Sequence, residues 1–172
     1  IDFSYIDSTY DSLDMLYNLD RIHNQKQAMK VLFPTGTPEY GFDLGISFDD
    51  PVGSQEILVG MYKELKSEVK KNNPEAFQQY IDLASNPYGI SCEFCCGVGP
   101  IGADEKGNSR CGCNHASALQ SITIYLADKG YSDEEILREA MKWKTVWFPQ
   151  VMLELVLGYE VDDDIPVMVG SC

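Results

Sequence analysis

The amino-acid sequence predicts an all-α fold, an irregular bundle of five to seven helices in a single domain that covers residues 1–172. Two observations support this class. Apolar residues recur at helical spacing in several segments, and start and stop signals of helices bracket those segments. Two other segments lack this spacing, and we expect them to form a long loop rich in Gly, Pro and Asp and a cysteine-rich loop that binds metal.

The first third of the chain holds a helical segment followed by a loop. In residues 7–32, Leu13, Leu16 and Leu19 have helical spacing, which predicts one or two helices. Residues 33–53 are dense in Pro, Gly and Asp, which predicts a long ordered loop or two short extended pieces. Loops this long are uncommon in compact domains and are often functional.

Two helices are expected next. Ser54 is placed to cap a helix that runs to about Lys71. Asn73-Pro74 begins another, with proline at its first helical position. Helical spacing places five apolar residues of the first helix on one face: Ile57, Leu58, Met61, Leu65 and Val69. In the second helix it turns four residues inward: Phe77, Tyr80, Ile81 and Leu83.

Two further helices have clear boundaries in the sequence. Residues 118–129 are helical up to Gly130, because glycine suits the position just after a helix. Ser132, with Glu135 three residues later, forms a capping box that opens the next helix. The inner stripe of that helix is Ile136, Ala140, Trp143 and Trp147.

The end of the sequence is apolar and then acidic. Pro149 breaks or kinks the preceding helix. Residues 151–159 are apolar on both faces, which favours a buried helix. Residues 160–172 form an acidic tail that includes three consecutive aspartates.

The charge balance limits the partners. The chain has 13 basic and 27 acidic residues and a formal net charge of -14 at pH 7. Such a surface repels phosphate backbones and anionic membranes, which argues against nucleic acid as a partner. No segment approaches the roughly 20 apolar residues of a membrane span. Because the sequence starts at Ile1 rather than Met, we expect an upstream segment, such as a leader or an anchor.

Five of the six cysteines form one cluster, with the pattern C-x2-C-C followed by a glycine-rich stretch and C-x-C-x-H. In a C-x2-C knuckle the turn directs two thiolates at one ion, and a close pair from a later loop completes a tetrahedral set. Glycines permit positive φ and leave backbone amides free to bond to sulfur. The pattern predicts a metal or cluster site in the loop at residues 90–115. Its candidate ligands are Cys92, Cys95, Cys96, Cys111, Cys113 and His115.

The identity of the metal stays open at this point. Four ligands satisfy zinc, an iron–sulfur cluster takes four thiolates, and Cu(I) favours cysteine. Zinc would suit a structural role, whereas a cluster or copper would suit electron transfer, redox sensing or metal handling. Cys172 is distant in sequence, and we expect a free terminal thiol there, with an additional ligand as the alternative. The expected core ligands are Cys92, Cys95, Cys111 and Cys113, with Cys96 and His115 as alternates.

Two other uses of the cysteines are open. An even total of six allows three disulfides, as in an exported structural or interaction domain. Against this, cysteines so close in sequence would close very short loops, which stabilise little. The second alternative is a thiol redox protein, but the C-x2-C here has no βαβ context, so thioredoxin-like chemistry has weak support.

The runs ISCEFCCG, CGCNHASAL, SDEEIL and KWKTVWFP, with FPTGTPEYGFDLGISFDD upstream, resemble a group of poorly characterised archaeal proteins with a cysteine block of this form. The resemblance covers residues 31–150. Members of the group tend to carry a hydrophobic N-terminal segment. The resemblance therefore implies a membrane-anchored, extracytoplasmic domain, with a cytoplasmic location as the other option. It implies no activity.

The sequence thus predicts a metal- or iron–sulfur-cluster-binding protein with a protein partner. We find no Ser/His/Asp set, no phosphate-binding glycine loop and no convincing carboxylate pair, so no catalytic residue is predicted and an enzyme is the less favoured reading. With only two histidines, metal-dependent hydrolysis of the histidine-rich kind is excluded in practice.

Overall fold

The computed structural model describes residues 2–172, which form nine α-helices and two short 3-10 helices and contain no strand. The all-α class is therefore confirmed. Seven of the helices correspond to expected ones, and two short ones, α3 and α6, lie in segments expected as loops. The bounds are α1 (Thr9–Tyr17), α2 (Gln25–Leu32), α3 (Glu39–Leu44), α4 (Pro51–Asn72), α5 (Pro74–Ala84), α6 (Glu93–Cys96), α7 (Asn114–Asp128), α8 (Asp133–Trp147) and α9 (Pro149–Leu157), with 3-10 helices at Phe3–Tyr5 and Leu19–Arg21.

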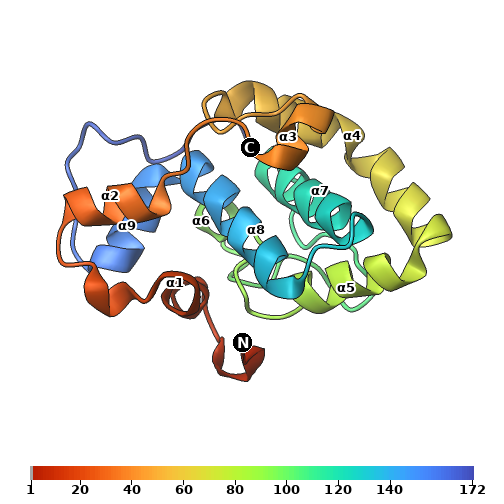
Figure 1. Ribbon diagram of the computed structural model, residues 1–172, viewed down its shortest axis with the longest axis horizontal. Coiled ribbons are helices and arrows are strands. Elements are labelled where there is room, and N and C mark those ends of the chain that lie inside the picture. Colours follow the sequence, from red (N-terminus) through yellow and green to blue (C-terminus); the bar gives the residue numbers. More distant parts are fainter. Residues whose placement is uncertain (1) are drawn as a thin grey trace.

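Helix α7 is the centre of the fold. It packs against α4, α5 and α8 (Figure 1). Twelve of its fifteen residues are buried, as expected for a helix enclosed by others. Its buried hydroxyls bond to backbone carbonyls, since Ser121 donates to Leu58 O and Thr123 to Leu119 O. The first turn of this enclosed helix carries His115.

Helix α8 packs beside α7 and supplies the two tryptophans of the core. Its capping box at Ser132 and Glu135 is present as predicted. The Trp143 and Trp147 rings are both buried, with centroids 5.4 Å apart. Pro149 ends this helix and begins α9, so the predicted break is confirmed.

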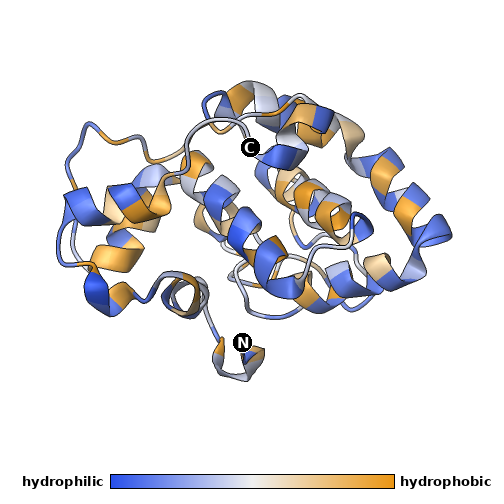
Figure 2. Ribbon diagram, in the orientation of Figure 1, coloured by the Kyte–Doolittle hydropathy of each residue, from blue (hydrophilic) through white to orange (hydrophobic). Residues whose placement is uncertain are grey.

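A second layer covers one end of this bundle. Helix α2 packs against α9, and α1 packs against both α8 and α9 (Figure 1). Hydrophobic and hydrophilic bands alternate along α4 and α8 in Figure 2, as amphipathic helices require. Among the described residues, no helix combines the length and the apolar composition needed to cross a bilayer.

Two helix starts differ from the prediction. Helix α4 begins at Pro51 rather than at Ser54, because Asp50 caps it by accepting a hydrogen bond from the Gly53 N–H. Ser54 is buried one turn inside the helix and donates to Ser47 O. Helix α7 begins at Asn114, four residues earlier than expected, because a cysteine acts as its cap.

Candidate metal centre

The short helix α6 carries the first three cysteines. Cys92 is its buried N-cap residue, while Cys95 and Cys96 are exposed on the helix itself. Residues four apart lie on one helical face, which brings the Sγ atoms of Cys92 and Cys96 to 3.0 Å. Gly97 ends the helix in the left-handed conformation, with φ of 70°. The C-x2-C-C pattern thus folds as one helical turn rather than as an extended knuckle.

Cys113 caps the N-terminus of α7. Its Sγ accepts a hydrogen bond from the Ala116 N–H at 3.4 Å and lies 3.9 Å from the Cys95 Sγ. A hydrogen bond from Cys92 lowers the pKa of Cys113 to about 3, and the same bond raises the pKa of Cys92. Desolvation raises the pKa of Cys111 to about 11. The pKa of Cys96 is also lowered, since its desolvation is outweighed by hydrogen bonds from Cys92 and Cys111. The negative charge of the metal-free cluster therefore favours Cys113, at the positive end of the helix dipole, and Cys96.

His115 lies in the first turn of α7 and is buried. Its Nε2 is 2.7 Å from the Val169 carbonyl oxygen, which can only accept, so Nε2 carries the proton. In the neutral imidazole Nδ1 is then the nitrogen with the free lone pair, and it faces the Sγ of Cys172 at 3.6 Å. The ring packs on Phe148, with centroids 4.6 Å apart. This is the tautomer and the orientation that a metal-ligating imidazole needs.

The loop between the two cysteine pairs is fixed by a buried glutamine. The Nε2 of Gln120 donates to Gly102 O at 3.0 Å and to Ser109 Oγ at 2.8 Å. Its Oε1 accepts from the hydroxyl of Tyr80, which also donates to Gly107 O. Gly102 passes so close to Ile90 that a Cβ atom would lie 1.9 Å from the Ile90 carbonyl oxygen. The loop therefore returns Cys111 and Cys113 to α6 along one defined path.

Cys172 is a free thiol, as expected, and it also reaches the centre, as an additional ligand would. The tail folds back along the bundle, where Gln55 exchanges two hydrogen bonds with the backbone of Ser171. Asn114 donates to the Ser171 hydroxyl at 3.0 Å. The Val169 N–H donates to Trp147 O. These contacts, all N-terminal to Cys172, direct its sulfur at His115.

The seven donors form three groups in which all ligand atoms lie within 4.8 Å of one another. All six cysteines are free in the described part of the chain, so the structure lends no support to a disulfide framework. The centre could hold metal, and it brings together every predicted ligand together with Cys172. The groups are Cys95, Cys113, His115 and Cys172; Cys92, Cys95 and Cys96; and Cys92, Cys111 and Cys113.

A fully buried cation lies below the cysteine helix. Lys144 of α8 donates to Glu93 Oε1 at 2.7 Å, to Gly89 O at 2.8 Å and to Thr9 Oγ1 at 3.1 Å. Its ammonium lies 4.7 Å from the centroid of the Phe94 ring. Burial lowers the pKa of Lys144, and the charge of Glu93 opposes this shift. The lysine thus ties α6 to α8 and to α1.

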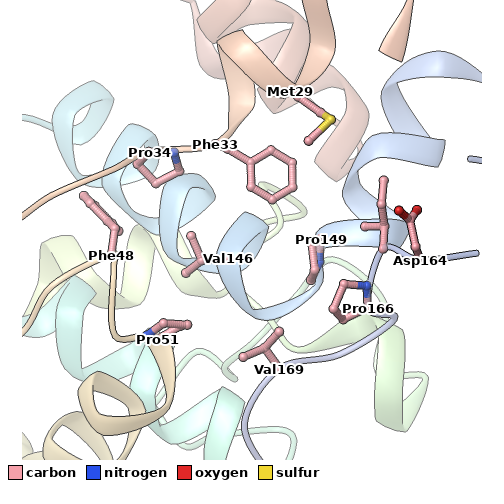
Figure 3. A pocket seen from close by; sticks show the side chains of 11 residues that line it. Met29, Phe33, Pro34, Phe48, Pro51, Val146, Pro149, Asp164, Pro166 and Val169 are labelled. Carbon is pink, nitrogen blue, oxygen red and sulfur yellow. The ribbon is translucent and has the colours of Figure 1, made fainter. Parts of the chain in front are cut away.

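An apolar cavity of about 350 Å³ lies on the other side of the tail. Figure 3 shows side chains from α2, from the α8–α9 junction and from the tail arranged around it. Val169 is shared, since its side chain lines the cavity and its carbonyl holds His115. The lining residues are Met29, Phe33, Pro34, Phe48, Pro51, Val146, Pro149, Asp164, Ile165, Pro166 and Val169.

Comparisons with protein-family models, curated proteins and solved structures find no match to the chain. The resemblance to a group of archaeal proteins therefore stays a prediction, and the case for function depends on the site itself.

Sequence reasoning missed two residues beside the centre, Lys144 and Glu93, and did not favour Cys172 as a ligand. Lys144 occupies a position on the apolar stripe of α8 that Leu137, Met141 and Phe148 share, and a lysine on such a stripe is a signal of a buried ion pair. Glu93, next to the first cysteine, is its partner. Cys172 had no local signal, because only the return of the tail brings it to the site.

Proposed function

We propose that the protein binds soft metal ions at this centre and passes them to a partner protein. The observation that carries the proposal is the donor set, six thiols and one imidazole gathered at a single place. Thiolates select soft ions such as Cu(I) and Zn(II) over hard ones such as Mg²⁺ and Ca²⁺.

The number and exposure of the donors favour transfer over a structural role. A structural zinc site uses four ligands and is closed, whereas this centre offers seven. Cys95, Cys96 and Cys172 are exposed. An exposed thiolate lets an incoming ligand of a partner approach the ion before the first ligand leaves, so the ion need not pass through water.

The fold has a core that does not depend on the metal. The buried residues of α7 and α8 pack around the two tryptophans, and the buried polar side-chain atoms of the described residues all have hydrogen-bond partners. Zinc fingers, by contrast, need the ion to fold because they lack such a core. Because this core can hold the fold together, a bound ion can leave the centre and be transferred to a partner.

The charge of the chain indicates the kind of partner. A formal net charge of -14 would attract a protein whose docking surface is basic and would speed their encounter at low ionic strength. Association should therefore slow as salt is added.

The proposal is tested by the metal and acid-labile sulfide content of protein purified without oxygen, followed by transfer of the metal to a coloured chelator. We expect bound copper or zinc, no sulfide and complete transfer. The variant His115→Ala should bind more weakly, while His23→Ala, which changes the exposed second histidine, serves as the matched control.

Two results would overturn the proposal. Iron and sulfide in comparable amounts would instead make the protein an electron carrier. Absence of metal, with thiols that react only after reduction, would make the cysteines a disulfide framework.

A further inference from the structure

The three donor groups are linked to one another through shared cysteines. Cys95 belongs to the first and second groups, Cys92 to the second and third, and Cys113 to the third and first. Each shared sulfur thus lies between two neighbouring groups. The other four donors, Cys96, Cys111, His115 and Cys172, belong to one group each.

We infer that the centre binds three Cu(I) ions in a ring, in which Cys92, Cys95 and Cys113 bridge successive ions. This inference rests on the proposed function and gives it a metal and a stoichiometry. A thiolate sulfur has lone pairs for two soft ions, so three bridges and three ions close a six-membered ring. The arrangement uses all seven donors and leaves none over.

The donor count at each position selects the ion. Two groups offer three thiolates each, the one that contains Cys96 and the one that contains Cys111. The third group, which contains His115 and Cys172, offers three thiolates and one imidazole nitrogen. Cu(I) accepts three thiolates, whereas zinc in proteins is nearly always four-coordinate. Three zinc ions would therefore leave two positions short of a ligand.

The surroundings suit an anionic cluster. Six thiolates and three monovalent ions leave three negative charges. The N-terminus of α7 meets the ring at Cys113, and the ammonium of Lys144, which is paired with Glu93, lies buried beneath α6. The exposed sulfurs of Cys95 and Cys96 are solvated on the outer side.

The test is a titration of the full, reduced, metal-free protein with Cu(I) in the absence of oxygen, followed by native mass spectrometry. We expect saturation at three ions per chain. X-ray absorption of the loaded protein should show copper–copper scattering.

Two cysteines of the α6 turn make a pair of variants. Cys92 bridges the two positions that have three thiolates each, and Cys96 serves only one of them. We expect Cys96→Ser to bind two Cu(I) ions and Cys92→Ser to bind one, because Cys92→Ser leaves both of those positions with two thiolates. Circular dichroism of both metal-free variants checks that the helices are intact, so a lost ion reports coordination.

The outcomes separate this inference from the proposed function. Saturation of the wild type at one or two ions, or equal losses in Cys92→Ser and Cys96→Ser, would overturn the ring and leave metal binding in place. Failure of the wild type to bind Cu(I) or Zn(II) would overturn both.

Discussion

The Nζ atom of Lys144 lies 2.7 Å from Oε1 of Glu93, the residue that follows Cys92, and the lysine side chain is fully buried while the glutamate is 13% exposed. A buried charge is tolerated only when it is paired and hydrogen-bonded. Lys144 has three acceptors, which match the three N–H groups of an ammonium. The cysteine helix is therefore held to α8 by an ion pair that water hardly reaches.

Removal of this lysine should destabilise the protein strongly. We expect Lys144→Met to lower the free energy of unfolding by about 3 kcal/mol, because Glu93 would keep a partly buried charge without its partner. Lys142→Met is the matched control on the same helix, where the Lys142–Glu139 pair is more exposed, and it should cost less than about 1 kcal/mol. Urea unfolding at neutral pH measures both, and equal losses would contradict the role of burial.

The thiolate of metal-free Cys113 should persist into acid. A hydrogen bond from Cys92 lowers its pKa from 9.0 to about 3, so the stabilisation it provides is complete above pH 9 and is lost as the pH falls through about 3. Between about pH 8 and pH 4 we expect ultraviolet absorbance from the Cys113 thiolate. Cys113→Ser should reduce this absorbance, whereas an unchanged signal in that variant would place the charge on another cysteine.

The histidine should act through both of its ring nitrogens. The variant His115→Ala removes the ligand atom Nδ1 and also the hydrogen bond from Nε2 to the Val169 carbonyl. We therefore expect its metal affinity to be at least tenfold lower. Amide hydrogen exchange of residues 165–172 should also speed up in this variant. Competition with a chelator and exchange mass spectrometry measure the two effects, and unchanged exchange would mean that the tail is held without the histidine.

The close approach of Gly102 to Ile90 should make this glycine irreplaceable. A Cβ atom would lie 1.9 Å from the Ile90 carbonyl oxygen, so Gly102→Ala should destabilise the protein by about 1–3 kcal/mol and disturb the cysteine loop. Gly60→Ala is the control. It lies inside α4 with open space around it, and the substitution should stabilise by about 0.5–1 kcal/mol. Thermal unfolding distinguishes the two, and equal effects would contradict the close contact.

The helices were predictable because their signals are local. Ser132 and Glu135 form the predicted capping box, Asn73-Pro74 begins α5, and Trp143 and Trp147 face inward as their spacing indicated. The start of α4 was predicted at Ser54 but lies at Pro51. Both Ser54 and Asp50 are residue types that favour the N-cap position, and the proline after Asp50 favours the first position of a helix.

The site was predictable only in part. The five clustered cysteines and His115 converge because the loop between them is short and fixed by Gln120, whose role depends on a fold that spacing does not reveal. The contribution of Cys172 arises from contacts between the tail and Gln55. Such contacts depend on packing between distant segments, which no local pattern encodes.

The return of the tail also sets an order of assembly. The two three-thiolate groups close within a short stretch of chain, whereas the group with His115 and Cys172 joins residues 57 positions apart. Contacts between distant residues form late in folding. We therefore expect refolding in the presence of metal to fill the two local positions first and the position at Cys172 last. A partner that displaces the tail would remove Cys172 from the centre. The ion at that position, which is the last to bind, would then be the first to leave.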